Sequence, residues 1–340
     1  MKFLNHKNGN LYIDEKSILD PIDNNVQIKI HACGVNRADI LQKKGFYPPP
    51  KGESEIIGLE CSGVIEKTGS MAKKFKVGDH VCAILGGGGY AEYVNVNEKQ
   101  VMHIPSNLNT HESASLPETI LTVYENIFNI SEFKENETVL IHGGSSGIGT
   151  TALSILKNYT ENLYVTAGSD EKCSKCIEIG AKDAINYKKY DFEKYFEEKE
   201  ISIDVILDMV GGSYLKKNLK ILNNKGRLNY IAALDGIKSE INLLYVMTKQ
   251  LKISGSTLRS RSSDEKGKIV DSVVQNIWPL IEKEKFKPTI FQTFKMEDAN
   301  LAHALMESSK HIGKILLDIK GGKEWTYMSI KQRYYLKAIM

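Results

Sequence analysis

The stretch Val139-Leu-Ile-His-Gly-Gly-Ser-Ser-Gly-Ile-Gly-Thr-Thr-Ala-Leu-Ser-Ile-Leu156 joins a short apolar run, a glycine-rich turn and a segment with helical apolar periodicity. Glycines in such a turn let the backbone bend sharply and approach a pyrophosphate, whose charge the N-terminus of the following helix favours. The order of strand, turn and helix therefore predicts a dinucleotide site. The predicted cofactor contacts in this turn are Gly143, Gly144, Ser145, Ser146, Gly147 and Ile148.

The segments around this turn predict an α/β protein with two domains, because 340 residues exceed one ordinary core and 41% hydrophobic content can fill two. Short β-branched runs punctuated by glycine and proline predict a mostly antiparallel β-barrel before the turn. Alternating strands and helices predict a doubly wound parallel sheet, a Rossmann domain, around and after it. The expected parts are the barrel-like domain at 1–120, the Rossmann domain at 121–288, a return to the first domain at 289–320, and a tail at 321–340 that matches no element.

Composition excludes several classes of protein. No run approaches 18 apolar residues, and the N-terminus has no apolar core of a secretion signal, so neither a membrane partner nor secretion is expected. Five scattered cysteines do not form a disulfide framework, which favours the cytoplasm. A net charge of +3 is too balanced to indicate a nucleic-acid partner.

Several motifs in consistent order carry a family resemblance. They are Cys33-Gly-Val-Asn-Arg-Ala-Asp-Ile40, Gly45-Phe-Tyr-Pro-Pro-Pro50, Gly58-Leu-Glu-Cys-Ser-Gly-Val64, Val77-Gly-Asp-His-Val81 and Ala114-Ser-Leu-Pro117, together with the glycine turn. Residues 1–320 resemble the zinc-free quinone oxidoreductases, the zeta-crystallin-like branch of the medium-chain dehydrogenase/reductases, and most of all the animal NADPH:quinone reductases. The resemblance implies a GroES-like catalytic domain, a Rossmann domain and an active-site cleft between them.

The resemblance also predicts that no metal is bound. In the alcohol dehydrogenases of this superfamily a Cys and a His stand at the positions of Asn36 and Leu59, and neither side chain here is a usual zinc ligand. A structural zinc needs four close cysteines, and the region 82–120 supplies only Cys82. The Cys173/Cys176 pair lies on a predicted helix without a second pair, so we interpret it as a packing pair.

Loss of zinc restricts the chemistry that this site can perform. A quinone or an activated alkene accepts hydride at carbon and spreads the charge over a conjugated oxygen, so it needs no metal. The family pattern makes Asn36 and Tyr47 the candidate catalytic residues: Asn36 orients cofactor or substrate, and Tyr47 donates a hydrogen bond or a proton. The alternatives are a turn amide for Asn36 and a rim aromatic for Tyr47.

The end of the second Rossmann strand favours NADPH over NADH. An NAD enzyme usually places a carboxylate there for the ribose hydroxyl, whereas Gly168 and Ser169 leave room for a phosphate. Ser169, Lys172 and Tyr187 resemble the 2′-phosphate set of the family. The carboxylates of Asp170 and Glu171 disfavour binding of a 2′-phosphate unless they point away from it. Thr122 and Leu258 resemble residues near the nicotinamide, and their alternative role is a helix cap or a core position.

Other classes of protein compete with this hypothesis. The glycine turn also resembles that of short-chain dehydrogenases, but their Tyr-x-x-x-Lys pattern occurs four times here, as chance allows where Lys and Tyr are common. A zinc-free alkenal or enone reductase shares the fold and the hydride step, and a non-enzymatic NADPH-gated binding protein is the third alternative. The preferred hypothesis is a cytoplasmic NADPH:quinone oxidoreductase acting on a small quinone or enone.

A homodimer is also expected. Family members of this type pair through the Rossmann domain, and Leu243–Met247 with Leu251–Gly255 supply apolar, β-prone residues where its last strands would lie. An exposed strand edge of this kind invites a partner. The alternative is a strand buried under the predicted 269–285 helix within one subunit.

Overall fold

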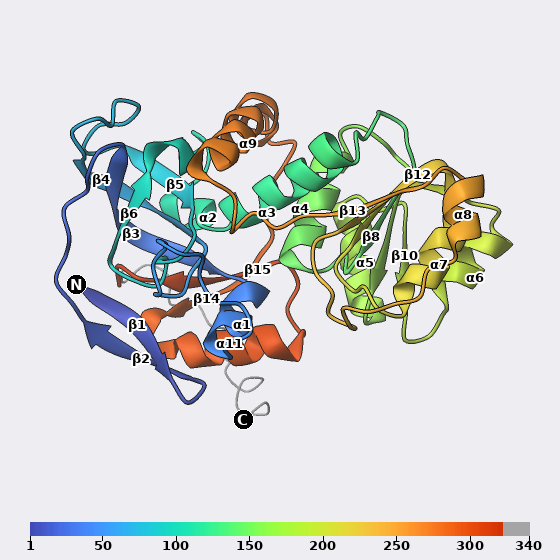
Figure 1. Cartoon of the computed structure of the whole chain (residues 1–340), viewed down its shortest axis with the longest axis horizontal. Helices are drawn as coiled ribbons and strands as arrows, with labels where there is room; N and C mark the ends of the chain where they lie inside the picture. The colour runs from blue at the N-terminus through green and yellow to red at the C-terminus, as the bar shows by residue number, and fades with distance from the viewer. Residues whose placement is uncertain (322–340) are drawn as a thin grey trace. The chain divides into compact units, whose positions relative to one another are not determined.

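The computed structural model describes residues 1–321, which form two compact units (Figure 1). Within the described residues, the first unit combines Met1–Pro117 with 290–321, and the second unit is Glu118–Thr289. Both are built around a β-sheet, and each is described below by itself.

The first unit contains a seven-stranded sheet in the order β14-β15-β3-β4-β5-β7, with β6 also paired to β3. Its strands are β3 (Asn25–Val35), β4 (Glu60–Thr68), β5 (His80–Ile84), β6 (Tyr93–Asn97), β7 (Val101–His103), β14 (Ile290–Lys295) and β15 (Lys314–Asp318). All pairs are antiparallel except β14 with β15. The long strand β3 is central because Val26, Ile28 and Ile30 are buried and anchor it in the core.

The predicted, mostly antiparallel domain is confirmed, but its sheet does not close into a barrel in the part of the chain that the structure describes. Within residues 1–321 the pairings run from β14 to β7 and do not return, so the sheet is open. The three-residue strand β7 offers few backbone groups for a closing ladder. A hairpin of β1 (Lys2–Lys7) and β2 (Asn10–Glu15), which the sequence analysis did not predict, forms a separate sheet.

Short helices complete the first unit: α1 (Arg37–Lys43), α2 (Thr110–Ser113), α11 (Ala299–Ser308) and the 3₁₀ turns η1 (Glu98–Gln100) and η3 (Met296–Asp298). Helix α11 buries Ala302, Leu305 and Met306 in the same core cluster as β3. The spacing of these residues by three and by one places them on one face of the helix. The strand, helix and strand after residue 289 thus belong to the sheet of the first unit.

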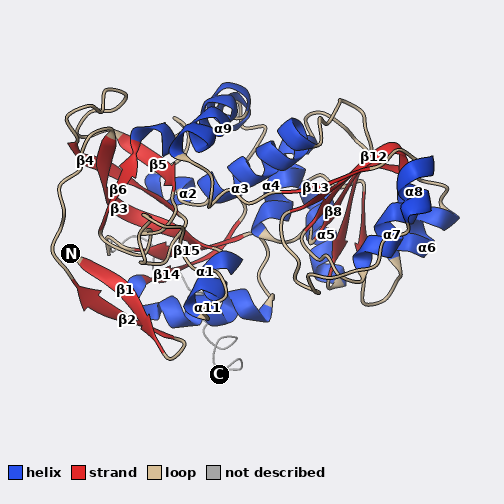
Figure 2. Ribbon diagram, in the orientation of Figure 1, coloured by secondary structure: helices blue, strands red, loops and turns tan. Residues whose placement is uncertain are grey.

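The second unit is a doubly wound sheet of six parallel strands in the order β10-β9-β8-β11-β12-β13, and Figure 2 shows it flanked by helices. The strands are β8 (Val139–His142), β9 (Leu163–Ala167), β10 (Asp183–Asn186), β11 (Ile203–Asp208), β12 (Leu222–Tyr230) and β13 (Lys252–Gly255). The connecting helices are α4 (Gly147–Leu156), α5 (Asp170–Ile179), α6 (Phe192–Glu198), α7 (Tyr214–Ile221) and α8 (Leu243–Thr248). The predicted Rossmann sheet is therefore confirmed.

Two predictions within the second unit are wrong. Leu243–Met247 is not a strand but part of α8, whose N-terminus Asn242 caps by accepting from the Leu244 N–H. The predicted helix 269–285 is two helices, α9 (Ser263–Asn276) and α10 (Trp278–Glu282), because Pro279 can stand only in the first turn of a helix. Helix α3 (Pro117–Val123) continues into the π-helical turn η2 (Tyr124–Ile130).

Candidate functional site

The glycine turn connects β8 to α4 as the sequence predicts. Gly143 has φ +74°, a conformation that favours glycine. A Cβ at Gly149 would lie 2.4 Å from the Gly143 carbonyl oxygen, so only glycine lets the helix start this close to the turn. Ser146 caps α4, since its hydroxyl oxygen accepts from the Gly149 N–H at 3.0 Å.

The turn lies where this fold binds ligands. Strands β8 and β11 are neighbours in the sheet, but the chain runs from β8 to one edge and from β11 to the other. Ligands of open α/β sheets bind at the carboxyl ends of the strands at such a switch point. The first N–H groups of α4, at Gly147 and Ile148, lack partners within a helix and suit a phosphate oxygen. Ser145 and Gly144 complete the turn, which fits a dinucleotide.

The predicted 2′-phosphate residues follow β9, which pairs with β8, and β10, which is the edge strand on the other side of β9. Ser169 caps α5 by accepting from the Lys172 N–H at 3.3 Å, and burial lowers the pKa of Lys172. A Cβ at Gly168 would lie 2.8 Å from the Tyr187 hydroxyl oxygen, so glycine lets this ring approach the strand end. Gly168, Ser169, Lys172 and Tyr187 are therefore brought together.

The two carboxylates beside this group differ in their surroundings. Asp170 accepts from Asn186 Nδ2 at 2.7 Å and from Lys189 Nζ at 2.5 Å, and these contacts lower the pKa of Asp170. Its charge is thus directed at Lys189 and Asn186. Glu171 is exposed on α5.

Thr122 and Leu258 both lie in the second unit. Thr122 is buried in α3, and its carbonyl accepts from Asn126 Nδ2 at 2.8 Å in the π-helical turn. Leu258 is buried in the loop after β13. Ser256, near it in sequence, donates to Asn126 Oδ1 at 2.8 Å, so Asn126 links the two segments.

Asn36 lies in the first unit between β3 and α1, where two buried charged residues hold its carboxamide. Lys314 Nζ donates to Asn36 Oδ1 at 2.7 Å and to Glu60 Oε1 at 2.6 Å, and Asn36 Nδ2 donates to Glu60 Oε1 at 2.8 Å. Because an ammonium only donates, the amide oxygen must face Lys314. Gly34 adjoins this group, since a Cβ there would overlap Glu60 Oε1. We call Asn36, Glu60, Lys314 and the neighbouring Asp39 the Asn36 cluster.

Asp39 extends the cluster into the core. Its Oδ2 accepts from the Asn36 backbone N–H at 2.7 Å and from the Tyr90 hydroxyl at 3.0 Å. The Tyr90 hydroxyl oxygen lies 3.1 Å from His303 Nε2. Burial raises the pKa of Asp39 to about 7 and lowers that of His303 to about 3. This network was not predicted from the sequence, although Asp39 and Glu60 stand inside two of the family motifs.

The other predicted positions of the first unit are Tyr47 and Leu59. Tyr47 lies half-buried in the loop after α1, and Leu59 is buried before β4. Within residues 1–321 no group of His, Cys, Asp and Glu side chains is arranged to hold a metal ion. Cys173 and Cys176 are buried thiols on α5, and burial raises the pKa of both, that of Cys176 to about 12.

The Tyr195/Lys199 match to the Tyr-x-x-x-Lys pattern forms a hydrogen-bonded pair. Lys199 Nζ donates to the Tyr195 hydroxyl oxygen at 2.9 Å, and the Tyr195 hydroxyl donates to Asp183. A surface hollow of about 570 Å³ beside them is lined by Thr138, Asn162, Tyr164, Lys182, Asp183, Tyr195, Lys199, Ile201 and Ser202. Several of these residues stand directly before a strand. The Tyr195/Lys199 pair therefore lies at the amino edge of the sheet, the edge formed by the amino ends of its parallel strands. The dinucleotide turn is at the carboxyl edge, which separates this chain from short-chain dehydrogenases.

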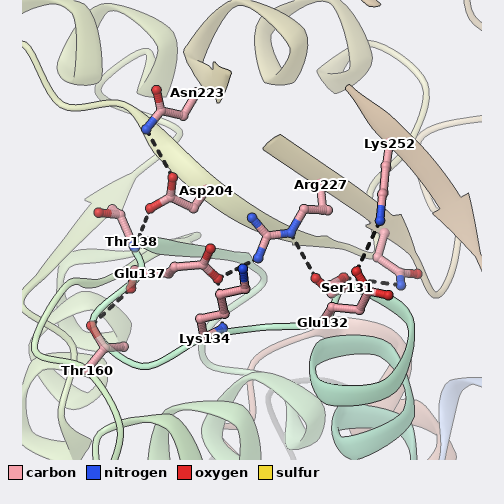
Figure 3. A network of polar contacts seen from close by, with 11 residues as sticks. Ser131, Glu132, Lys134, Glu137, Thr138, Thr160, Asp204, Asn223, Arg227 and Lys252 are labelled. Atoms are coloured by element: carbon pink, nitrogen blue, oxygen red, sulfur yellow. Dashed lines mark hydrogen bonds and ion pairs between the residues drawn. The ribbon is translucent and has the colours of Figure 1, made fainter. Parts of the chain in front are cut away.

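The amino edge also carries a polar network, shown in Figure 3. Arg227 pairs with Glu137 and donates from Nε to the Ser131 carbonyl at 2.8 Å. Asp204 accepts from the Thr138 N–H at 2.9 Å. These contacts connect β11, β12 and the segment before β8, so we assign them to stability.

Comparison with known proteins places the chain in a family. Residues 22–106 match the alcohol dehydrogenase GroES-like domain, and residues 179–317 match the zinc-binding dehydrogenase model. Quinone oxidoreductase of Homo sapiens is 31% identical over 303 residues, 87% of this chain and 90% of the relative. Escherichia coli quinone oxidoreductase, whose structure is a complex with NADPH, has TM-score 0.82 and 25% identity over 94% of this chain and 99% of that one.

A second group of structures shares the fold. JamJ enoyl reductase superimposes with TM-score 0.83 at 23% identity, over 93% of this chain and 98% of that one. At that identity the likeness shows the fold alone. No helix within residues 1–321 has the length and hydropathy needed to cross a bilayer. The chain belongs to the medium-chain dehydrogenase/reductase superfamily, in the zinc-free quinone oxidoreductase branch of its oxidoreductases.

Proposed function

We propose that this protein is an NADPH-dependent quinone oxidoreductase that transfers hydride from the nicotinamide to a small quinone without zinc. The observation that carries the proposal is the glycine turn at the β8/β11 switch point, beside a strand end where Gly168 and Ser169 replace the usual carboxylate. The quinone oxidoreductases of human and Escherichia coli support it.

Bound NADPH would supply the hydride, and the chain would bind and orient it. The turn and the N-terminus of α4 would hold the pyrophosphate. Ser169, Lys172 and Tyr187 would hold the 2′-phosphate, with Lys172 as its cation.

Asn36 would act as a hydrogen-bond donor in this mechanism. Its amide oxygen is occupied by Lys314 and one amide hydrogen by Glu60, which leaves the second amide hydrogen for a ligand oxygen. Quinones and enones present such an oxygen. Tyr47 would donate a hydrogen bond or a proton at the same substrate.

A substrate panel tests this proposal. The purified protein is assayed with ortho-quinones, para-quinones and alkenals, first with NADPH and then with NADH. We expect the highest kcat/KM with NADPH and a quinone. Preference for an alkenal would favour the enone reductase, and NADPH binding without turnover of any acceptor would favour a binding protein.

We also propose a homodimer formed by a second copy at β13. This strand is the edge of the six-stranded sheet, and Ile253 on it is exposed. Leu243, Leu244 and Met247 on the neighbouring α8 are each more than 60% exposed, so apolar surface is concentrated at this edge. Pairing of two β13 strands would give their edge N–H and C=O groups hydrogen-bond partners and would cover these apolar side chains.

Sedimentation at micromolar concentration tests the dimer. Ile253→Lys places like charges opposite each other across the two-fold axis, so we expect at least tenfold weaker association. Val77→Lys, at a position 63% exposed in the first unit, is the control and should leave association unchanged. A 38.1 kDa monomer that persists as concentration rises would exclude the dimer.

A further inference from the structure

A line of buried polar side chains lies under the glycine turn. His142, the last residue of β8, is fully buried. Its Nε2 lies 2.8 Å from Asn218 Oδ1 in α7, and its Nδ1 lies 3.0 Å from Thr166 Oγ1 in β9. None of these side chains has a role in the proposed chemistry, yet a buried polar group of this kind is costly unless it is fully bonded.

The hydrogen bonds in this line run in one direction. Asp208 Oδ2 accepts from Asn218 Nδ2 at 2.9 Å, so the amide oxygen of Asn218 faces His142 and the imidazole proton is on Nε2. The Nδ1 lone pair then accepts from the Thr166 hydroxyl. The Thr166 oxygen in turn accepts from the Gly143 N–H at 3.4 Å. We call Asp208, Asn218, His142 and Thr166 the His142 chain.

Both ends of the His142 chain hold loops of the dinucleotide site. At one end Thr166 also accepts, through its carbonyl, from the Gly144 N–H at 2.9 Å. At the other end Asp208 Oδ1 accepts from the N–H groups of Val210 at 2.6 Å and Gly211 at 3.1 Å, in the loop after β11. The chain therefore spans the switch point from the turn after β8 to the loop after β11.

The two loops also pack directly on each other. A Cβ at Gly143 would lie 2.6 Å from Met209 Sδ, so a shift of either loop moves the other. The rings of Phe192 and Tyr214 lie 4.8 Å from the His142 ring, and burial lowers the pKa of His142. These surroundings keep the imidazole neutral, as its bond from Thr166 requires.

We propose that the His142 chain positions the glycine turn relative to the Met209–Gly212 loop and thereby sets the affinity of the site for the pyrophosphate-containing cofactor. The four side chains are positioning residues that act through backbone N–H groups. The inference rests on the proposed dinucleotide function. It adds that affinity depends on a uniform hydrogen-bond direction maintained by residues from β8, β9, β11 and α7.

The test compares Thr166, in β9, with Thr160, which lies just before the same strand. Thr166→Val keeps the shape of the side chain but leaves His142 Nδ1 and the Gly143 N–H without their partner, whereas Thr166→Ser keeps the hydroxyl. Thr160→Val is the matched control: its buried hydroxyl donates to the Glu137 carbonyl at 2.9 Å and accepts from the Asn162 N–H at 3.1 Å, at the amino edge (Figure 3).

The measurements are the Kd for NADPH by calorimetry and the urea midpoint without cofactor. We expect Thr166→Val to raise the Kd about tenfold, Thr166→Ser to stay within about twofold of wild type, and Thr160→Val to lower the midpoint with an unchanged Kd. If Thr166→Val does not fold, His142→Gln serves instead, because its amide can still donate to Asn218 while the link to Thr166 is broken. The same tenfold rise is expected.

The outcomes separate the inference from the function on which it rests. Wild-type protein that binds NADPH, with equal Kd values for Thr166→Val and Thr160→Val, would overturn the inference alone. Wild-type protein that binds neither NADPH nor NADH would overturn the proposed function and the inference with it. A Kd raised only at Thr166 or His142, and restored by Thr166→Ser, would support both.

Discussion

The Asn36 cluster of the first unit is built around charged and ionisable groups, whereas the His142 chain of the second unit is neutral over most of its length and ends on one carboxylate, Asp208. Lys314 and Glu60 are both almost fully buried, and their attraction must offset the loss of hydration of two ions. The His142 chain avoids most of that cost because imidazole, amide and hydroxyl groups are cheaper to bury. Stability in the first unit should therefore depend on charge and pH, and cofactor affinity in the second on hydrogen-bond geometry.

Removing the ammonium group of Lys314 should produce the largest change in the free energy of unfolding. Lys314→Met leaves the Glu60 carboxylate buried without its ion pair, which typically costs about 3–5 kcal/mol. Urea unfolding measures the loss. Lys295→Met, at an exposed position on the neighbouring strand β14, is the control and should cost less than about 0.5 kcal/mol.

A double variant separates charge from packing at this site. Glu60→Gln combined with Lys314→Met removes both charges, so it should recover a large part of the loss. If the double variant were as unstable as the sum of the single variants, the two side chains would not be coupled and the comparison would fail.

The second effect is the pH dependence that Asp39 gives the first unit. Its pKa is about 7 in the folded chain against 3.8 for an ordinary Asp, so the folded state holds the proton more tightly. The stabilisation from this proton is complete below pH 3.8 and is lost as pH rises through about 7. Between pH 5 and 8 the loss should be about 2–3 kcal/mol.

Asp39→Asn isolates this contribution, because an amide does not titrate. The difference in unfolding free energy between variant and wild type should change by about 2–3 kcal/mol in favour of the variant from pH 5 to pH 8. A difference that stays constant with pH would show that Asp39 does not titrate in this window. His142→Gln should show a pH dependence of the opposite sign. Burial lowers the pKa of His142 below its ordinary value of 6.5, so toward pH 5 only the unfolded chain protonates this imidazole, and the wild type loses stability there while the variant does not.

The third prediction concerns the one cation proposed to contact the cofactor in the second unit. Lys172→Ala should raise the KM for NADPH about tenfold and leave that for NADH nearly unchanged, since only NADPH has the 2′-phosphate. Lys175→Ala is the control, because Lys175 lies one turn further along α5 and pairs with Glu178 at 2.7 Å. Equal effects on both cofactors would contradict the assignment of Lys172.

The sequence predicted features that depend on neighbouring residues better than features that depend on distant ones. The glycine turn, the alternating strand β3 and the parallel strands follow local patterns, and the structure contains them. The Lys314–Glu60 pair joins residues 254 positions apart, and the His142 chain takes its members from three strands and a helix. Helix α8 was mistaken for a strand because Leu, Tyr and Val suit both elements, and the cap at Asn242 decides between them.

The smallest expected effect is that of a chelator, and it tests whether the Asn36 cluster serves a metal. Asn36 Oδ1 accepts from Lys314, and Glu60 Oε1 accepts from both Lys314 and Asn36, so these oxygen atoms already have N–H donors. Leu59 supplies no donor, and zinc prefers thiolate and imidazole ligands. Purified protein incubated with chelator should therefore keep its proposed activity, the reduction of a quinone by NADPH, measured before and after. One zinc per chain by elemental analysis, lost together with activity, would show that the cluster binds a metal and would remove the contrast between an ion pair in the first unit and a neutral chain in the second.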